Sequence, residues 1–523
     1  MRPGIVFKYI GVVMLLEAAF LLVCAMVDLA AMIGLVEGAW AASGIASDIA
    51  SGSVAASNTT SGIASAAGGL ANGAAAGSFR ALILSAAIAG AIGALPTLLV
   101  RRQEHISNKE GYCIVVGAWL ASCVVGMLPY LFWGGEFSVL DAWFESVSGF
   151  TTTGSSAIAD VEALPRGMLF WRSCTHWIGG AGVVMFAMLV MPILGRSRMM
   201  VSSVEMSSVA RDDYKYTSGK VLRIILTVYL SLSAACVVML VVAGMGWFDA
   251  VNHAMSIVAT GGFSTRNLSL AHWNSPLVEG VTMFFMMVSG LHFGVIFATL
   301  TGRRNNLFRS EVVRYYLASL AVVALIVSVS SLAAGVYENF WQALRFGAFQ
   351  TVSITTTTGL VAADHNLWGP LAMAVLSFAS IQCACAGSTS GGLKSDRVWL
   401  AAKIVRQQIR QQQHPNAIIR IKLGGVTQEA STLGFVMLFI VTYFFLMGIG
   451  TAVIAAFGYD PVTAFSMSVS SLGNVGQGFG EIGGFGNFST VAPGVRFVCT
   501  LLMLLGRLEI FGLLQLFLLK WWR

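Results

Sequence analysis

Charged residues are scarce in this chain. Asp, Glu, Lys and Arg together make up 11% of its 523 residues, whereas hydrophobic residues make up 56% and the mean hydropathy is +0.78. Water-soluble domains carry about 25% charged residues and bury their apolar side chains in a limited core. The shortage of charge therefore excludes a soluble globular domain and indicates a polytopic membrane protein.

Motifs for metal binding, disulfide formation and nucleotide binding are also missing. The eight cysteines lie in or beside apolar runs, without a CxxC pair or a neighbouring histidine pattern. We therefore expect small buried side chains rather than a zinc site or a disulfide framework. No Walker or Rossmann motif occurs, and no covalently bound cofactor is expected. No nucleophile–base pair or ligand set lies at a common depth, which leaves an intramembrane enzyme without support.

Ten apolar runs are long enough to cross a hydrocarbon layer of about 30 Å, which takes roughly 20 helical residues. They cover residues 5–27, 81–100, 112–133, 167–195, 221–245, 276–300, 313–336, 367–386, 432–457 and 494–519. The first run resembles a signal peptide, but it is long, carries Glu17 and lacks a small-x-small cleavage site, so we expect a retained anchor. The sequence predicts an all-α polytopic membrane protein.

Positive charge predicts the orientation of these helices. Lys and Arg cluster near the N-terminus and at residues 101–109, 196–220, 303–314, 403–422 and 520–523. The positive-inside rule places such clusters in the cytoplasm, so the N- and C-termini are predicted to be cytoplasmic. Most acidic residues of the connecting loops then fall outside, among them Asp28, Asp160, Glu162, Asp364 and Glu481. The net charge of +7 thus reflects the topology, and the basic cytoplasmic clusters are a candidate docking surface. A nucleic-acid partner has little support.

Four polar stretches recur between the apolar runs. They read ESVSGFTTTGSS (145–156), HAMSIVATGGFS (253–264), GAFQTVSITTTTGLV (347–361) and SMSVSSLGNVGQGFG (466–480), and they align on Gly154, Gly262, Gly359 and Gly476. A recurrence at a spacing of roughly 100 residues indicates internal repeats. We therefore predict an N-terminal helix pair with an external loop (1–108), followed by four helix, pore loop, helix repeats at 109–216, 217–308, 309–424 and 425–523.

The repeats predict a central pore. Irregular backbone at membrane depth is tolerated only where it is buried in protein or lines a water-filled cavity, and four such loops can meet around one axis. Glycine lets each loop turn its carbonyl oxygens toward that axis. The short helices point their negative C-terminal ends at the centre, which favours a cation there. A single stretch taken alone favours a helix-packing surface or an external turn, whereas four in register favour the pore.

The stretches TTTGSS, ATGGFST, TTTTG and NVGQGFG resemble the four filter segments of the Trk/Ktr/HKT superfamily of potassium transporters. Over residues 110–523 the chain is most similar to the bacterial TrkH-type potassium uptake subunit, and the two extra N-terminal helices are also similar to TrkH. The resemblance implies that potassium binds at a filter formed by Thr152, Thr153, Gly154, Thr260, Gly261, Gly262, Thr357, Thr358, Gly359, Asn474, Val475 and Gly476. All four central positions are glycine, which implies a preference for potassium.

The chain departs from the family pattern at two places. Gln477 stands in the fourth segment where the pattern leads us to expect proline, and residues 39–78 form an insertion rich in Ala, Gly and Ser. The insertion is nearly uncharged and lacks proline, so we expect a flexible external loop. A weak additional helix around residues 62–77 is the alternative, which is disfavoured because Ala and Gly supply little apolar area.

The third repeat contains a stretch that predicts a gate, CACAGSTSGGLKSDR (383–397). Its residues Gly387, Ser388, Thr389, Ser390, Gly391 and Gly392 follow Gly359 by 28–33 residues. The cytoplasmic basic clusters follow the glycines of the other repeats by 41–44 residues. The loop therefore falls inside the membrane, on the cytoplasmic side of the filter. Arg507 follows Gly476 by 31 residues and falls at the same depth.

A mid-membrane arginine costs about 2.5 to 3.5 kcal/mol on insertion scales, so Arg507 must face a polar cavity or a partner. The carbonyls and hydroxyls around Ser388 to Ser390 are its natural partners, and both elements would narrow the pore. Glu509 lies on a different helix face and is a poor direct partner. The alternatives are a structural pairing of Arg507 between helices and a surface turn at GSTSGG. The resemblance favours the gate, because TrkH-like proteins carry an intramembrane loop in the third repeat and an arginine in the last helix.

The segment KIVRQQIRQQQH (403–414) predicts a helix that emerges into the cytosol, where a protein or anionic membrane lipid can contact it. The resemblance implies a TrkA-like cytosolic nucleotide-binding ring that regulates opening, and a homodimer with one pore per protomer. The sequence thus favours channel-like potassium uptake across the bacterial inner membrane, with a potassium-binding subunit of an ATP-driven pump as the alternative. Glu145 is expected to form hydrogen bonds behind the filter, and His176, His253 and His292 to support the core or the filter.

Overall fold

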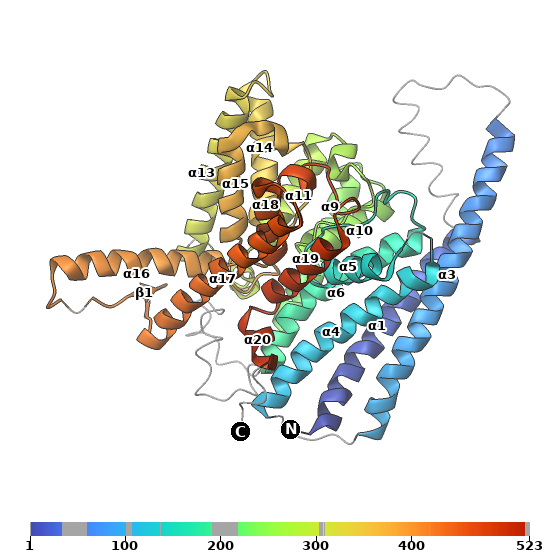
Figure 1. The fold of residues 1–523 in the computed structure, drawn as a ribbon, viewed down its shortest axis with the longest axis horizontal. Helices are drawn as coiled ribbons and strands as arrows, with labels where there is room; N and C mark the ends of the chain where they lie inside the picture. Colours follow the sequence, from blue (N-terminus) through green and yellow to red (C-terminus); the bar gives the residue numbers. More distant parts are fainter. Residues whose placement is uncertain are drawn as a thin grey trace.

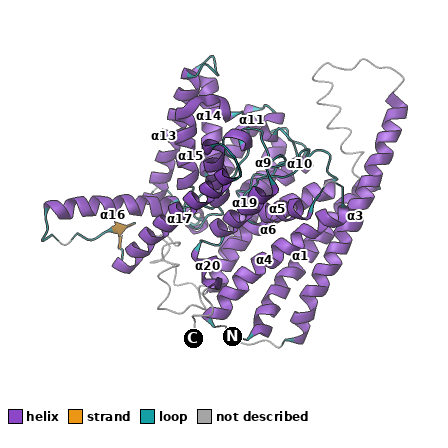
Figure 2. Ribbon diagram, in the orientation of Figure 1, coloured by secondary structure: helices purple, strands orange, loops and turns teal. Residues whose placement is uncertain are grey.

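The computed structural model describes residues 2–33, 60–100, 107–135, 137–190, 218–302, 307, 309–417 and 419–517. Within these residues the fold is almost entirely helical (Figures 1 and 2). The strands β1 (Lys422–Leu423) and β2 (Val426–Thr427) pair antiparallel in a short hairpin. Short 3-10 helices, η1 (Ser269–His272), η2 (His365–Trp368) and η3 (Gly480–Ile482), lie in connecting loops. The predicted basic clusters at 101–102, 196–217, 303–306 and 520–523, and residues 39–59 of the insertion, lie outside the described residues.

Six described helices are long and apolar enough to cross a membrane. They are α1 (Pro3–Met32), α3 (Thr60–Leu99), α4 (Asn108–Trp133), α9 (Ser218–Val242), α13 (Glu311–Ala333) and α17 (Ala430–Ala456). Large apolar side chains on these helices, such as Met26, Leu99 and Val242, are exposed on the protein surface. Extensive exposed apolar surface marks a region that faces lipid. The prediction of an all-α multi-pass membrane protein is confirmed.

The N-terminal helix pair differs from its prediction. α3 begins at Thr60, so the expected flexible loop is wrong for residues 60–78, which belong to the helix. Alanine has the highest helix propensity, and glycine lets two helices approach closely. A Cβ added to Gly93 would lie 2.6 Å from the carbonyl oxygen of Gly11 in α1. Close backbone packing at Gly93 therefore stabilises the part of α3 that pairs with α1.

Four short helices precede the glycine segments: α5 (Val139–Phe150), α10 (Trp247–Val258), α14 (Phe340–Thr355) and α18 (Pro461–Gly473). Side chains cap the N-termini of α5, α14 and α18 and satisfy free backbone N–H groups, whereas α10 follows Gly246 without a side-chain cap. Ser138 and Asp141 form a capping box on α5, and Asp460 accepts hydrogen bonds from the N–H groups of Val462 and Thr463 in α18. Hydrogen bonds from Thr463 hold the pKa of Asp460 below its ordinary value. The caps fix where α5, α14 and α18 begin, and each of the four helices ends shortly before its glycine.

The helix that follows a glycine segment is continuous only in the first repeat, where α6 spans Arg166–Val190. In the second repeat, α11 (Pro276–Ser289) and α12 (Phe293–Leu300) meet at a bend of 102°. In the third, a loop separates α15 (Gly369–Gln382) from α16 (Ser395–Gln413), and in the fourth, residues 508–510 separate α19 (Pro493–Arg507) from α20 (Phe511–Phe517). The predictions of single helices over 276–300 and 494–519 are therefore wrong.

These breaks have identifiable physical causes. The Gly290 carbonyl at the end of α11 accepts a hydrogen bond from Cys385 N, and Phe293 N at the start of α12 donates to Gly387 O. The loop of the third repeat thus takes backbone hydrogen bonds that a continuous helix would use. Between α19 and α20, Glu509 and Ile510 have left-handed backbone with φ of 52° and 48°. A right-handed helix cannot continue through that conformation.

Candidate functional site

The four glycine segments share one backbone geometry. The residue two positions before each glycine is left-handed, with φ between 52° and 57° for Thr152, Thr260, Thr357 and Asn474. The residue just before each glycine donates its N–H to the end of the short helix, from Thr153 to Ser148 O, Gly261 to Ser256 O, Thr358 to Ser353 O and Val475 to Ser470 O, at 2.8 to 2.9 Å. Left-handed backbone is costly for threonine and persists only where the surroundings hold it. The equivalent geometry agrees with the predicted register.

The four segments close into a ring. A Cβ added to each glycine would collide with a carbonyl oxygen of the next segment: Gly154 with Gly261 O at 2.0 Å, Gly262 with Thr358 O at 2.2 Å, Gly359 with Val475 O at 2.3 Å, and Gly476 with Thr153 O at 2.0 Å. The glycines also have φ between 72° and 88°, a conformation that favours glycine. Only glycine fits at these positions, and the contacts bring backbone oxygens of all four segments around one axis.

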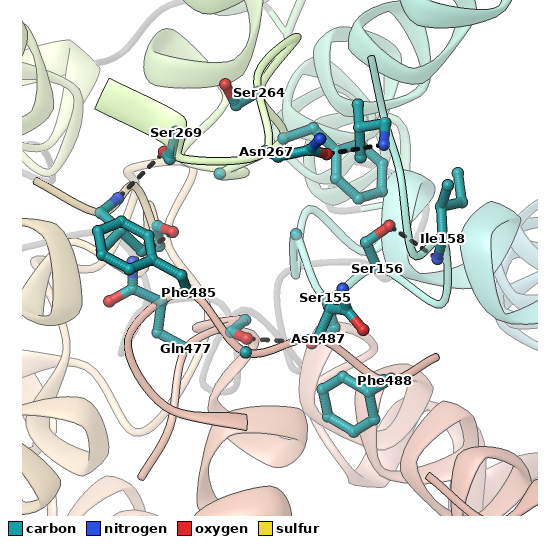
Figure 3. Close-up of a pocket in the computed structure, with 18 of the residues that line it drawn as sticks. Ser155, Ser156, Ile158, Ser264, Asn267, Ser269, Gln477, Phe485, Asn487 and Phe488 are labelled. Atoms are coloured by element: carbon teal, nitrogen blue, oxygen red, sulfur yellow. Dashed lines mark hydrogen bonds between the residues drawn. The ribbon is translucent and has the colours of Figure 1, made fainter. Parts of the chain in front are cut away.

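A cavity of about 220 Å³ lies against this ring and is lined by all four glycines (Figure 3). Polar side chains that follow the glycines, among them Ser155, Ser156, Ser264 and Gln477, surround the cavity. Among the residues that the structure describes, no group of three or more His, Cys, Asp or Glu side chains could hold a metal ion. The cavity is lined by the four glycines and by serine side chains, and rings of backbone carbonyls can replace the hydration shell of a cation.

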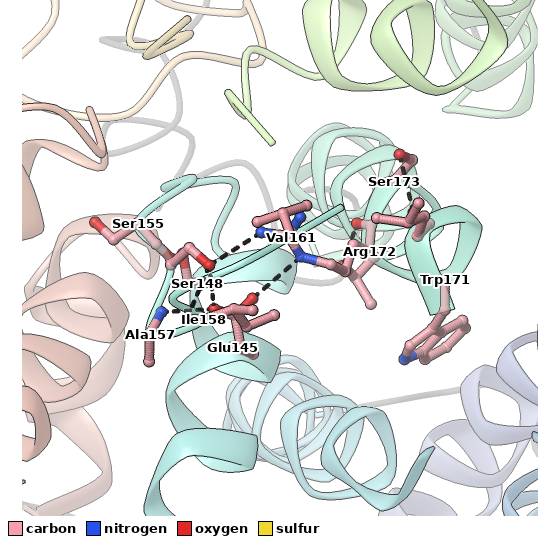
Figure 4. A network of polar contacts seen from close by, with 12 residues as sticks. Glu145, Ser148, Ser155, Ala157, Ile158, Val161, Trp171, Arg172 and Ser173 are labelled. Carbon is pink, nitrogen blue, oxygen red and sulfur yellow. Dashed lines mark hydrogen bonds and ion pairs between the residues drawn. The ribbon is translucent and has the colours of Figure 1, made fainter. Parts of the chain in front are cut away.

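Glu145 lies behind the first segment and is fully buried (Figure 4). Its Oε1 accepts hydrogen bonds from Ser156 Oγ and Ala157 N, both at 2.6 Å, and its Oε2 accepts one from Arg172 Nε at 3.3 Å. A buried carboxylate is stable only when it is paired and hydrogen-bonded. The expected hydrogen bonding of Glu145 is confirmed, and it fixes the backbone that follows Gly154.

Arg172 of α6 links the first segment to the second, although the sequence analysis did not single it out. Its Nη1 donates to Ser264 O at 3.2 Å, and its guanidinium lies 4.0 Å from the centroid of the Phe263 ring. The sequence did contain a signal, because Arg172, like Arg507, is a charge inside a long apolar run. Arg172 also lines the cavity, where the pairing with Glu145 balances its positive charge.

The isolated histidines and the cysteines have supporting roles. A ring nitrogen of His176 lies 3.2 Å from Ser256 Oγ, and one of His253 lies 3.0 Å from Ser264 Oγ. His292 caps α12 by accepting a hydrogen bond from a backbone N–H. All eight cysteines are free and buried. The predicted burial of the cysteines is confirmed, and the contacts of the histidines agree with the predicted support of the core or the filter.

The loop between α15 and α16 lies directly against the ring, on the side of the residues that precede the glycines. Thr389 Oγ1 lies 3.2 Å from Thr260 Oγ1 and donates to Val258 O at 3.1 Å. Gly391 N donates to Thr357 Oγ1 at 3.2 Å. Ser388, Thr389 and Ser390 are at most 2% exposed, so GSTSGG is not a surface turn. The loop thus covers the face of the ring opposite to the cavity.

Arg507 holds this loop from the last repeat. Its Nη1 donates to Thr389 O at 2.7 Å, and its Nη2 donates to Gly179 O of α6 at 3.2 Å. The side chain is buried, so these carbonyls replace the water that would otherwise solvate the charge. The predicted contact between Arg507 and the loop is confirmed. Because Gly179 belongs to the first repeat, one arginine joins the first, third and fourth repeats.

Glu509 contacts a different pair of cations. Its two carboxylate oxygens lie 2.7 Å from Lys394 Nζ and 2.7 Å from Arg397 Nη2. Both cations stand at the start of α16, whereas Glu509 stands in the break between α19 and α20. The geometry agrees with the expectation that Glu509 does not pair directly with Arg507, and it ties the loop to the last helix.

A helical membrane fold, a closed ring of backbone oxygens and a buried loop across one face of that ring define a multi-pass ion-transport protein. Comparison with known proteins specifies the family. The family model described as TrkH, cation transport protein, matches residues 80–521, and the chain belongs to this family. Membership of a transport family makes the chain a transport protein and not an enzyme.

Individual relatives agree with this assignment. The Trk system potassium uptake protein TrkH of Salmonella typhimurium (strain LT2) is 33% identical over 441 residues, which cover 83% of this chain and 91% of the relative. The Trk system potassium uptake protein TrkG of Escherichia coli (strain K12) is 33% identical over 430 residues, or 80% and 86% of the two chains. The crystal structure of the potassium transporter TrkH from Vibrio parahaemolyticus is similar with a TM-score of 0.82 and 27% identity, and the match covers 100% of both chains.

Proposed function

We propose that this protein mediates channel-like uptake of potassium across a bacterial inner membrane. The observation that supports this most strongly is the closed ring of Gly154, Gly262, Gly359 and Gly476, each in contact with a carbonyl oxygen of the next segment. A ring of backbone oxygens can replace the hydration shell of potassium. The proposed potassium ligands are oxygens of residues 152–154, 260–262, 357–359 and 474–476.

Potassium is the proposed cargo for two reasons. The relatives from Salmonella and Escherichia coli are named potassium uptake proteins, and all four central filter positions here are glycine. Entry of a cation would follow the membrane potential, at about 2.3 kcal/mol per charge per 100 mV. The family match over residues 80–521 favours uptake over a role as the subunit of an ATP-driven pump.

The loop at 387–392 and Arg507 form the proposed gate. The loop lies against the ring through Thr389 and Gly391, so an ion that has passed the ring meets the loop next. Hydrogen bonds from a charged donor are about twice as strong as neutral ones. Arg507 donates one to Thr389 O of the loop and one to Gly179 O of α6, and so holds the loop in this position. Conduction then requires that the loop or Arg507 move aside.

A TrkA-like cytosolic nucleotide-binding ring is the proposed regulator. α16 continues directly from the gate loop, and its Arg406 and Arg410 are exposed. A protein bound along α16 would therefore act on the loop through one continuous helix. Anionic lipid is the competing partner for this basic segment. Assembly as a homodimer and a cytoplasmic location of both termini complete the proposal.

Fluxes of rubidium and sodium into proteoliposomes test the proposed function. The native protein is expected to pass rubidium and to exclude most sodium. Arg507→Ala removes the hydrogen bonds to Thr389 and Gly179 and is expected to raise rubidium flux about tenfold or more, because hydrogen bonds of charged groups contribute about 1.5 to 3 kcal/mol each.

The matched control is Leu501→Ala, a lipid-exposed position on the same helix, which should leave both fluxes unchanged. Equal sodium and rubidium fluxes through the native protein would contradict the potassium selectivity. An Arg507→Ala variant with native flux would contradict the gate.

A further inference from the structure

Two of the four glycine carbonyls beside the cavity receive a hydrogen bond from a side chain. Gln477 Nε2 donates to Gly359 O at 2.7 Å, and Ser155 Oγ donates to Gly476 O at 3.3 Å. Each donor directly follows the glycine of the neighbouring segment, and both side chains lie beside the cavity (Figure 3). In both contacts, the residue that follows one glycine donates to the carbonyl of the glycine in the adjacent segment.

The equivalent positions of the other two segments cannot make this contact. They hold Phe263 and Leu360, whose side chains have no hydrogen-bond donor. The four glycine carbonyls at the edge of the ring that faces the cavity thus differ in their side-chain hydrogen bonds. The carbonyls of the third and fourth segments are held by neighbouring side chains, whereas the residues placed to hold those of the first and second segments are apolar.

A second glutamine orients Gln477. Gln477 Oε1 accepts a hydrogen bond from Nε2 of Gln350, which belongs to the short helix α14. The Gly359 carbonyl can only accept a hydrogen bond, so Gln477 must present its NH₂ group to that carbonyl and its oxygen to Gln350. Gln350 is 0% exposed and Gln477 is 8% exposed. A buried group that loses its partner carries its full desolvation penalty, so the pair fixes the direction of the Gln477 donor.

We propose that Gln477 is a selectivity-determining positioning residue, which fixes the Gly359 carbonyl at the edge of the ring that faces the cavity. The inference rests on the proposed function of the ring as a potassium pathway, and Gln477 acts through the carbonyl rather than by contact with the ion. The Gly359 carbonyl, held by Gln477, cannot move toward the axis to the shorter oxygen–ion distance that sodium requires. The outermost site therefore favours potassium over sodium. Proline, the residue that the family pattern leads us to expect at position 477, would have no donor for this contact.

The ratio of rubidium to sodium flux in proteoliposomes of the full-length protein tests the proposal. Gln477→Met keeps the length of the side chain and removes the donor, and it is expected to lower the ratio about fivefold, the factor that corresponds to one net hydrogen bond. Rubidium flux at saturation is expected to stay within about twofold of the native value. Ser155→Ala is expected to lower the ratio less, because its hydrogen bond is longer.

Leu360→Met is the matched control, because it changes an equivalent ring position that has no donor before or after the substitution; its ratio should equal the native ratio. A native ratio in Gln477→Met would overturn the proposal, and so would an equal loss of both fluxes, which is the result of a purely structural role. Neither result affects the proposed function, which fails only if the native protein itself passes sodium and rubidium equally.

A variant at the orienting residue covers the case in which Gln477→Met does not fold. Gln350→Met leaves the donor of Gln477 in place and removes the partner that directs it. The ratio is then expected to fall about twofold to threefold, since part of one hydrogen bond is lost. An unchanged ratio in Gln350→Met would overturn the proposal.

Discussion

Gly476 has no room for a side chain. A Cβ at this position would lie 2.0 Å from Thr153 O, and the backbone φ of 82° is one that L-residues avoid. The obstructing atom belongs to the backbone of the neighbouring segment, so it cannot rotate away as a flexible side chain would. At the scale of single residues, sterics alone specify glycine at the four central positions.

Gly476→Ala is expected to lower rubidium flux per folded protein by about tenfold or more. The added methyl group must displace Thr153 from the ring, and a left-handed backbone costs alanine about 1 to 2 kcal/mol in addition. The measurement is rubidium uptake into proteoliposomes. Gly280→Ala is the control, because a Cβ at Gly280 meets nothing within 4 Å. Equal flux through the two variants would show that the ring tolerates a side chain.

At the scale of elements, the loop between α15 and α16 is anchored in its middle and where it enters α16. In the middle, Thr389 holds the loop against the ring and Arg507. Where the loop enters α16, Lys394 and Arg397 are paired with Glu509 in the break of the last helix. The ion pairs join the start of α16, which carries the exposed Arg406 and Arg410, to the break that directly follows Arg507 in the last helix. Under the proposed gating, a displacement of α16 would therefore act on the last helix as well as on the loop.

Glu509→Gln is expected to destabilise the protein by about 1.5 to 3 kcal/mol, because a neutral amide no longer balances Lys394 and Arg397. Rubidium flux without a regulator is expected to rise, since the loop loses one of its anchors. Thermal unfolding in detergent and proteoliposome flux measure the two effects. Glu311→Gln is the control, because the pair of Glu311 with Lys403 is partly exposed and should contribute less than about 1 kcal/mol. Native stability and flux in Glu509→Gln would exclude this anchoring role.

At the scale of the whole molecule, the N-terminal pair α1 and α3 is an addition on one flank. The two helices pack on each other and against α4 and α6 (Figure 1). The ring itself is formed by the four segments that follow α5, α10, α14 and α18. The stability of the pair and the chemistry of the ring should therefore respond to different substitutions.

Gly93→Val is expected to lower the free energy of unfolding by about 1 to 3 kcal/mol, because overpacking forces the backbones apart, and a Cβ at Gly93 would lie 2.6 Å from Gly11 O. The rubidium to sodium flux ratio should not change. Gly90→Ala is the control, since its Cβ would meet Ala18 at an ordinary 3.9 Å. A changed ratio in Gly93→Val would mean that the pair acts on the ring.

The sequence predicted contacts correctly where the number of residues from a central glycine corresponds to a depth in the membrane. The alignment on four glycines agrees with their shared backbone geometry. The residue offsets from those glycines predicted that Arg507 and the loop at 387–392 lie at the same depth. The structure contains the hydrogen bond from Arg507 to Thr389 O. Helical segments rise by a fixed amount per residue, so equal offsets reach equal depths. The roles of these residues as filter and gate stay predictions.

The sequence was a poor guide where contacts between repeats decide the structure. The bend between α11 and α12 depends on hydrogen bonds to Cys385 and Gly387, which belong to another repeat. The bridge that Arg172 makes to the second segment joins residues far apart in the chain. Composition and periodicity report the local chain and carry no information about such partners.

Closure of the ring also restricts how the four unlike copies could diverge. Each glycine lies against a carbonyl of the next segment, so a substitution of the glycine displaces the backbone of its neighbour. Substitutions of a glycine and of the residues that position the facing carbonyl would then be strongly non-additive, whereas paired substitutions away from these contacts would be nearly independent. The residue before each glycine contributes only a backbone oxygen to the contact, so its side chain can differ between segments, as in Thr153, Gly261, Thr358 and Val475.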